Sequence, residues 1–384
     1  MKIMCPHRPP CPGCPRFGEA GVAPLALRAL RDLAQLHHLP EPAVITGSVV
    51  GFRMRARLAI RGRVGSPKLG LFESDSHRVV HIPNCSVHHP LINRVADVVR
   101  RAIVDTQTSS YSEKARMGLA RYLQIVVERD SQTAQVVMVA NCATPAPMSA
   151  CLDLIQERLG TDLHSLWFNA NCESANTILG PDFHRWCGPE SVVERFGGAA
   201  VHYPPGAFGQ SNLDMSDEII GCVRDLIPHG SRVVEFYAGV GAIGLSVLTR
   251  VSEIRMNEFS VQSLHGLELG LADLDDAERS KVSVAPGSAA TTYEAASQAQ
   301  WVVVDPPRKG LDPALTEWLS LHPPEGLIYI SCGVESLMND VAHLTSRGTL
   351  RLGALTAFNL MPFTEHVETL AQFERTRARA PGPH

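Results

Sequence analysis

Three short motifs in the last third of the chain contain a thiol and two carboxylates, and two of the motifs follow predicted strands. The run DPPR at 305–308 follows the apolar residues 301–304, and Ser331 and Cys332 follow the apolar residues 327–330. Glu368 comes later, in the run HVE at 366–368. A cysteine with a carboxylate nearby can act as a nucleophile with a base at hand. Taken singly, the motifs could equally be a rigid turn, a structural cysteine and a surface charge.

This combination of groups fits methylation at carbon 5 of a uracil base. That carbon is too weak a nucleophile to attack a methyl donor unaided, but adding a thiolate to carbon 6 generates an enolate that can. A base must then remove the proton from carbon 5. Cys332 is the candidate nucleophile and Glu368 the candidate base.

A predicted strand-to-helix turn at 235–241 (EFYAGVG) is the candidate site for a methyl donor. Gly239 and Gly241 allow the backbone to turn tightly and approach a ligand. Glu258 ends the next predicted strand, where a carboxylate can accept hydrogen bonds from ribose hydroxyls. The three-glycine dinucleotide fingerprint is incomplete, because two residues separate Gly241 from Gly244, and this favours S-adenosylmethionine over NAD. The turn could also be a plain connection.

Four cysteines could supply thiolate ligands to a metal, namely Cys5, Cys11, Cys14 and Cys85. Four thiolates suit a 4Fe–4S cluster or a tetrahedral zinc ion, and spacing alone does not separate the two. Five other cysteines fit no motif and are interpreted as small core residues, namely Cys142, Cys151, Cys172, Cys187 and Cys222.

The charge of the chain is unevenly distributed. The net charge is −4, but residues 1–101 hold 15 Lys and Arg against 6 Asp and Glu, a balance of +9. A basic first part suits a phosphate backbone, although a solvated arginine-rich face would look the same. The opening residues do not resemble a signal peptide, and no apolar run is long enough for a membrane span, so a cytoplasmic protein is expected.

The spacing of apolar residues predicts an α+β first part and an alternating second part. Helices are expected at 23–37 and 91–103, a basic strand at 53–60, and a hairpin of 123–128 with 135–140. From about residue 208, short apolar runs alternate with helical stretches, as in a parallel, doubly wound sheet. These runs are residues 232–236, 253–256, 282–285, 301–304 and 327–330.

Four motifs together resemble the RNA uracil-C5 methyltransferase family: FGQSN at 208–212, DPPRKG at 305–310, ISCG at 330–333 and MPFTEHVETL at 361–370. The resemblance implies an α/β fold, with an S-adenosylmethionine-dependent, Rossmann-like class I methyltransferase domain at 208–375. It implies an α+β RNA-binding domain with the four-cysteine site at 1–207, whose helix at about 23–38 can pack on the catalytic domain. Residues 376–384 are expected to form a flexible tail.

The resemblance also implies roles for single residues. Cys332 matches the nucleophile and Glu368 the proton acceptor. The donor-contacting positions of the family match Gln210, Tyr237, Glu258 and Asp305, with Asp305 also near the target base, and Phe208 and Asn212 frame the pocket. This sequence departs from the family at three pocket positions, with Gly209 in place of a bulky residue, Ala238 in place of a cysteine and Ala242 in place of an asparagine.

The resemblance favours a 4Fe–4S cluster over zinc, because the iron–sulfur members of the family share the cysteine pattern. Members with the cluster mostly act on large-subunit rRNA, bacterial tRNA members lack these cysteines, and archaeal tRNA members have them. This chain reaches Cys5 without the small β-barrel that precedes the cysteines in several rRNA members, as in the shorter 23S rRNA branch. The expected substrate is therefore 23S rRNA, with tRNA as the alternative, and the expected protein is a monomer.

Two other classes of function stay open. The chain could be an iron–sulfur RNA-binding protein with an inactive methyltransferase fold, although the intact Cys332 and Glu368 speak against this. A class I methyltransferase acting on protein or DNA would leave Cys332 and the cysteine site unexplained.

Overall fold

The computed structural model describes residues 4–173 and 177–376, and the chain forms two compact units. Unit 1 comprises Met1–Gly18, Ser48–Glu194 and His202–Leu213, and unit 2 comprises Glu19–Gly47, Arg195–Val201 and Asp214–His384. These limits differ from the domain boundaries expected at 207 and 375, which remain a proposal. Most of the tail expected at 376–384 lies outside the described residues.

Unit 2 is built on an eight-stranded sheet with the strand order β1-β16-β17-β15-β14-β11-β12-β13. Its strands are β1 (Ala43–Ile45), β11 (Ser231–Phe236), β12 (Val251–Glu258), β13 (Val282–Pro286), β14 (Trp301–Val304), β15 (Gly326–Ser331), β16 (Leu350–Phe358) and β17 (Glu368–Arg375). Its helices are α1 (Pro24–Leu36), α4 (Leu213–Leu226), α5 (Ala242–Ser246), α6 (Val261–Ala272), α7 (Asp276–Arg279), α8 (Ala289–Thr292), η3 (Tyr293–Gln298), α9 (Pro313–Leu321) and α10 (Val334–Thr345).

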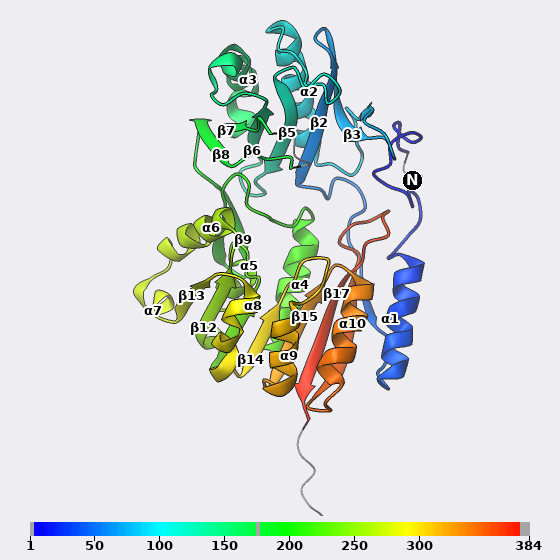
Figure 1. Cartoon of the computed structure of the whole chain (residues 1–384), viewed down its shortest axis with the longest axis vertical. Coiled ribbons are helices and arrows are strands. Elements are labelled where there is room, and N and C mark those ends of the chain that lie inside the picture. The colour runs from blue at the N-terminus through cyan, green and yellow to red at the C-terminus, as the bar shows by residue number, and fades with distance from the viewer. Residues whose placement is uncertain (1–3, 174–176, 377–384) are drawn as a thin grey trace, which may run out of the picture. The chain divides into compact units, whose positions relative to one another are not determined.

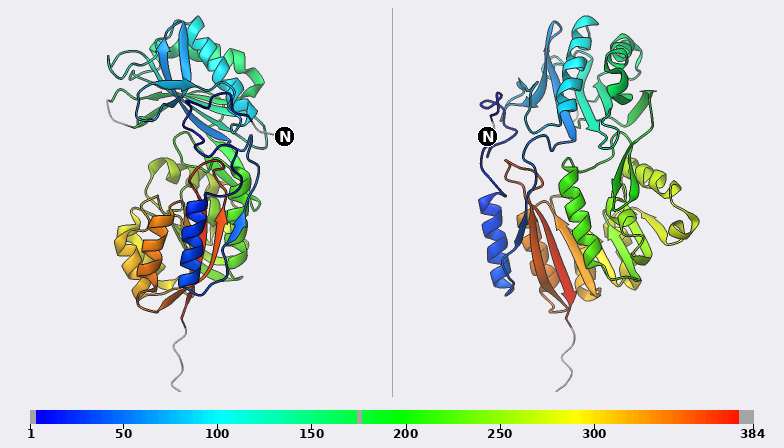
Figure 2. Two further views of the ribbon diagram at one scale, coloured as in Figure 1. Left: turned by 90° about the vertical axis from the view of Figure 1, so that its right-hand side faces the viewer. Right: turned by 180° about the vertical axis from the view of Figure 1, so that it is seen from behind.

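The strands of this sheet are parallel except β17, which runs antiparallel to β15 and β16. All residues of β14 and β15 are buried, as expected for central strands covered on both faces. Helices α9 and α10 cover one face and α4 covers the other (Figures 1 and 2). The five predicted apolar runs are confirmed as β11 to β15.

The first strand and helix of the chain belong to this sheet unit. β1 pairs in parallel with β16, with Ala43 opposite Thr356, and α1 packs against α10 and β16. Leu30 and Leu33 of α1 are buried in the same core cluster as Val341 of α10. The pairing depends on residues about 300 positions apart, so local sequence patterns do not reveal it.

Unit 1 is built on a seven-stranded sheet with the order β4-β3-β2-β5-β6-β7-β8. Its strands are β2 (Arg55–Arg63), β3 (Ser66–Phe72), β4 (Val79–His81), β5 (Ala120–Val127), β6 (Ala134–Ala140), β7 (Leu163–Ala170) and β8 (Asp182–Cys187). The helices α2 (Pro90–Asp105) and α3 (Ser149–Leu159) pack against each other and against the sheet, with η1 (Ala146–Met148) and η2 (Gly160–Asp162) flanking α3. The predicted basic strand, helix and hairpin are confirmed as β2, α2 and β5–β6.

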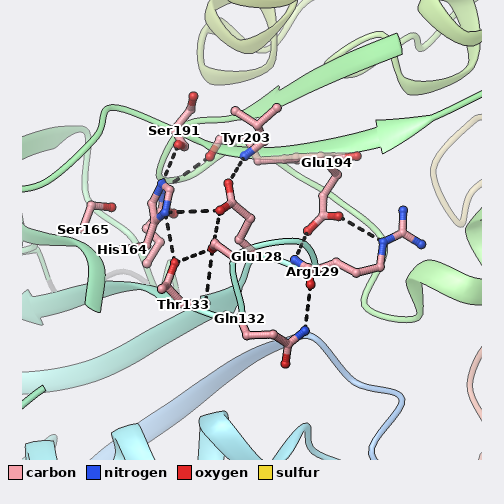
Figure 3. Close-up of polar contacts among 12 residues, drawn as sticks. Glu128, Arg129, Gln132, Thr133, His164, Ser165, Ser191, Glu194 and Tyr203 are labelled. Atoms are coloured by element: carbon pink, nitrogen blue, oxygen red, sulfur yellow. Dashed lines mark hydrogen bonds and ion pairs between the residues drawn. The ribbon is translucent and has the colours of Figure 1, made fainter. Parts of the chain in front are cut away.

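The short strands β9 (Val192–Phe196) and β10 (Ala199–Tyr203) pair with each other where the chain passes between the two units. Within unit 1, a polar network joins the turn between β5 and β6 to the start of β9 (Figure 3). Glu128 accepts a hydrogen bond from Val193 N at 2.9 Å, and Glu194 accepts one from Arg129 N at 2.9 Å. His164 Nδ1 lies 3.6 Å from the Glu128 carboxylate.

No helix in the described ranges 4–173 and 177–376 combines the length and the apolar character that a membrane crossing requires.

Candidate active site

The side chains that could take part in catalysis lie at one edge of the unit 2 sheet. The parallel strands β11, β12, β14 and β15 all end there, and the antiparallel β17 begins there. Strand order reverses at β11, which lies between β12 and β14, and ligands bind at such switch points in open α/β sheets. The topology therefore brings Glu258, Asp305, Cys332 and Glu368 to one edge from four different strands.

Cys332 and Glu368 are neighbours across two strands. Ser331, the last residue of β15, pairs with Thr369 of β17, so the next residue of one strand and the preceding residue of the other meet at the edge. Burial raises the pKa of the half-buried Cys332 thiol, and the carboxylates of Glu368 and Asp305 raise it further, whereas Arg308 lowers it. The thiol is therefore held protonated until a positive charge or a base acts on it.

Glu368 is almost fully buried, with 4% of its surface exposed. Its Oε1 atom has no hydrogen-bond partner among the described residues. Burial raises the pKa of Glu368 well above its ordinary value, and Asp305 raises it further. Burial also raises the pKa of Asp305, to about 7. A carboxyl pair of this kind retains a proton at neutral pH and can accept or release it there.

Glu235, a third buried carboxyl at this edge, did not stand out as a site residue in the sequence. It lies near the end of β11, and its Oε2 atom has no hydrogen-bond partner among the described residues. Burial raises its pKa well above the ordinary value, with Asp305 as the next cause. Its sequence signal is an acid within the otherwise apolar run 233–236 of β11. A cluster of buried carboxyls favours binding of a cation.

The turn after β11 has an unusual backbone. Tyr237, Gly239 and Gly241 all have positive φ, at 62°, 59° and 83°. A tyrosine in this region is uncommon, and such strain is found at binding sites. The Tyr237 hydroxyl accepts a hydrogen bond from Asp312 N at 3.1 Å, so this hydroxyl helps fix the start of α9.

The Glu258 carboxylate is held in place by backbone N–H groups. Oε2 accepts from Gly239 N at 2.8 Å, and Oε1 accepts from Phe259 N at 2.9 Å and from Ser260 N at 2.6 Å. Because Oε2 keeps a further lone pair, the carboxylate can still accept a hydroxyl hydrogen bond. The next side chain, Phe259, is 72% exposed, and an exposed aromatic beside a nucleoside site can stack on a base. The sequence reading did not single it out.

Gln210 and the other residues of the run 208–212 belong to unit 1. Phe208 is exposed and Asn212 is buried. Gly209 is explained by a close approach, because a Cβ there would lie 2.5 Å from the Tyr203 ring and 2.6 Å from Arg55 Cζ. The Arg55 guanidinium stacks on that ring at 4.0 Å from its centroid and occupies the space that a bulky residue would fill.

Cys5, Cys11, Cys14 and Cys85 all belong to unit 1, and none forms a disulfide. Burial raises the pKa of Cys14 to about 11, and charges on Cys85, Cys11 and Cys5 contribute to the same direction, as expected for neighbouring thiols. Four thiols are a suitable donor set for iron or zinc. In the residues that the structure describes, however, no group of three or more His, Cys, Asp or Glu side chains is arranged to hold a metal ion.

The sheet order, the antiparallel β17 and the acidic edge define an α/β fold of the class I methyltransferases. A family model described as tRNA (Uracil-5-)-methyltransferase matches residues 291–376, which include Asp305, Cys332 and Glu368. Among curated proteins, the chain is 36% identical to "Uncharacterized RNA methyltransferase pc1998" of Protochlamydia amoebophila, over 87% of this chain and 88% of that protein. It is 27% identical to an RNA methyltransferase of Enterococcus faecalis, over 84% of this chain and 71% of that protein.

Among solved structures, the fold is similar to the Pyrococcus abyssi tRNA (uracil-54, C5)-methyltransferase in complex with S-adenosyl-L-homocysteine. The TM-score is 0.76 at 21% identity, covering 94% of this chain and 86% of that one. The chain belongs to the RNA uracil-C5 methyltransferase family, whose members are enzymes.

Proposed function

We propose that this enzyme methylates carbon 5 of one uridine through a covalent adduct between Cys332 and carbon 6 of the base. The observation that carries the proposal is the meeting of Cys332 with the buried Glu368 at the sheet edge, beside Asp305. A class I methyltransferase acting on an amino group would need neither a thiol nor a second acid at this place.

The roles of the two residues follow from the electron balance. A base takes the proton of the Cys332 thiol, the thiolate adds to carbon 6, and the electron pair of the 5,6 double bond moves into an enolate. Carbon 5 then takes the methyl group, which S-adenosylmethionine supplies when it is bound. Glu368 removes the remaining proton from carbon 5, the double bond re-forms, and the sulfur leaves carbon 6 as a thiolate. The raised pKa of Glu368 makes its carboxylate a stronger base for this proton.

The donor fits the residues at the edge. The sulfonium and ammonium groups of S-adenosylmethionine are cations, and the edge offers the carboxyls of half-buried Asp305 and buried Glu235. Tyr237, Gly239 and Gly241 in the turn after β11, with Glu258 at the end of β12, are proposed to hold the nucleoside; Gln210, which belongs to unit 1, stays a proposed donor contact.

Trapping with RNA that contains 5-fluorouridine tests the proposal, because fluorine at carbon 5 cannot leave as a proton. The wild-type enzyme should form a covalent species on a denaturing gel, and Cys332→Ala should form none. With normal RNA, Glu368→Gln should accumulate methylated RNA still attached to protein. Cys222→Ala is the matched control and should behave as wild type. A Cys332→Ala enzyme that traps or methylates RNA would contradict the covalent route.

We further propose that Cys5, Cys11, Cys14 and Cys85 hold a 4Fe–4S cluster that stabilises unit 1. The donor types and the mutual effect of the thiols on the Cys14 pKa support this. Protein purified without oxygen should be brown and contain iron and sulfide, and Cys85→Ser should lose the colour together with stability. Colourless protein with one equivalent of zinc would decide for zinc instead.

The proposed substrate is 23S rRNA, with the enzyme acting as a monomer. The cysteine pattern supports this choice, and tRNA is the alternative because the Pyrococcus abyssi protein is by its title a tRNA enzyme. Unit 1 offers an RNA-binding face, with exposed Arg57 on β2 and Arg185 placed 5.9 Å over the Trp167 ring. Mapping 5-methyluridine in rRNA and tRNA from cells with and without the protein tests the choice.

A further inference from the structure

A cavity of about 410 Å³ opens beside Cys332 in unit 2. Arg308, Lys309 and His366 line it together with Cys332, and the Arg308 Nη2 atom lies 3.3 Å from His366 Nε2. Arg308 and Lys309 are exposed, and in the described part of the chain neither has a carboxylate within ion-pair distance. Two unpaired cations at the mouth of a cavity attract an anion.

One of the two acidic residues of the same lining is already bound by other groups. Asp340 is buried, and its Oδ2 atom accepts hydrogen bonds from Leu311 N at 2.8 Å and from the Tyr329 hydroxyl at 2.7 Å. Glu335 is exposed in the first turn of α10 and is the remaining carboxylate of the lining. The cavity also reaches the first residues of α10, which has no side-chain cap, and a helix N-terminus adds partial positive charge.

The loop that carries the two cations is fixed to α10. Gly310, at φ 87°, leaves no room for a side chain, because a Cβ would lie 2.5 Å from Asp340 Oδ2. The hydrogen bond from Leu311 N to the same carboxylate holds the next residue. Arg308 and Lys309 are therefore held beside Cys332 by the backbone before any ligand arrives.

The chemistry of a nucleotide connects the cations with the thiol. In the usual anti conformation of a pyrimidine nucleotide, carbon 6 is the ring atom that lies over the ribose 5′ oxygen. A thiol that adds to carbon 6 therefore approaches close to the 5′-phosphate of the same nucleotide. We infer that Arg308 and Lys309 bind the 5′-phosphate of the target uridine in this cavity, an inference that rests on the proposed function.

His366 has a different part in this site. Burial lowers its pKa, and Arg308 lowers it further, so the ring is neutral at neutral pH. A neutral ring 3.3 Å from the guanidinium can orient Arg308 without competing for the phosphate charge. His366 is thus a positioning residue.

Protection of Cys332 from iodoacetamide, followed by peptide mass spectrometry, tests the site without knowledge of the RNA. Uridine 5′-monophosphate and uridine are the probes. In wild type the monophosphate should protect Cys332 at concentrations at least about tenfold lower than uridine needs. A charge-assisted contact contributes at least that factor to affinity. In the double variant Arg308→Gln/Lys309→Gln the two probes should become nearly equal. Arg351→Gln, at the far end of β16, is the matched control and should keep the wild-type ratio.

Two outcomes would overturn the inference. One is equal protection by the monophosphate and uridine in wild type, and the other is an unchanged ratio in the double variant. Trapping by 5-fluorouridine RNA separates these failures from a failure of the covalent mechanism, since it reports on Cys332 alone. Single Arg308→Gln should also raise KM for RNA more than it lowers kcat, and His366→Gln should do so to a smaller degree.

Discussion

At the scale of single residues, the site is a set of carboxyls that desolvation keeps from ionising. Burial raises the pKa of Asp305 and of Glu368, Asp305 raises the pKa of Glu368 further, and Glu235 adds another acid with a raised pKa. A bound cation stabilises the ionised form of these carboxyls. Binding of the positively charged donor is therefore linked to the loss of protons from the site.

Donor affinity should accordingly depend on pH. The pKa of Asp305 in the free protein is raised to about 7, and a bound cation lowers it, so binding releases a proton near neutrality. The affinity for S-adenosylmethionine should fall as pH drops from 7.5 toward 5.5, by up to about tenfold per pH unit for one proton. Isothermal titration calorimetry in buffers of different ionisation enthalpy measures the donor affinity and the number of protons released on binding.

Asp305→Asn should flatten this pH profile, and Glu317→Gln, an exposed acid of α9, should leave it unchanged. S-adenosylhomocysteine lacks the sulfonium charge and should show a weaker dependence. A wild-type affinity that is constant between pH 5.5 and 7.5 would contradict this account.

The residues of the site were predictable from sequence to the extent that they end strands. Cys332 and Asp305 follow apolar runs that were predicted as strands, whereas Glu368 was found through its motif and the strand that it starts was not predicted. Glu235 was missed because an acid inside an apolar run looks like an ordinary strand residue until its burial is known. The reason for Gly209 was also hidden, since it depends on an arginine of β2 more than 150 positions earlier.

At the scale of elements, the network between the β5–β6 turn and β9 contains a carboxyl, that of Glu194, whose ionisation is unfavourable in the folded protein. Burial raises the pKa of Glu194 to about 7, while the backbone N–H and the charge of Arg129 lower it. The folded state thus binds a proton more tightly than the unfolded state, in which the pKa is about 4.5. Stability should therefore fall as pH rises from about 4.5 to about 7 and change little from this source above that.

Glu194→Gln should remove that dependence. The variant should be more stable than wild type at pH 8, by at most about 3 kcal/mol, and the difference should shrink toward pH 5. Urea unfolding at the two pH values measures it, with Glu157→Gln on the exposed side of α3 as control. An equal difference between variant and wild type at both pH values would show that Glu194 is ionised throughout.

The sequence predicted which segments form helices and strands better than it predicted which of these elements pack together. Buried runs of Val, Ile and Leu predicted the parallel strands because such strands are apolar on both faces. The helix at 24–36 was predicted from its spacing, but its core partners in α10 are set by contacts across most of the chain. Local patterns encode periodicity and carry no information on such distant pairing.

At the scale of the whole molecule, the chain is interleaved. It passes from one unit to the other after residues 18, 47, 194, 201 and 213. The basic excess of residues 1–101 lies in unit 1, because the segment Glu19–Gly47 of unit 2 holds two arginines against three acidic residues. A cut at any single position therefore leaves at least one unit without a segment that it needs.

The pairing of β1 with β16 has a consequence for how the protein is made. The ribosome releases residues 43–45 long before their partner residues 356–358, and about 300 residues at 5–20 per second is roughly 15 to 60 seconds. Unit 1 is fully synthesised by residue 213, whereas unit 2 needs residues from both ends. The half of the enzyme that carries Cys332 therefore completes its fold last, and its first strand and helix lack their core partners until residues 356–358 have been made.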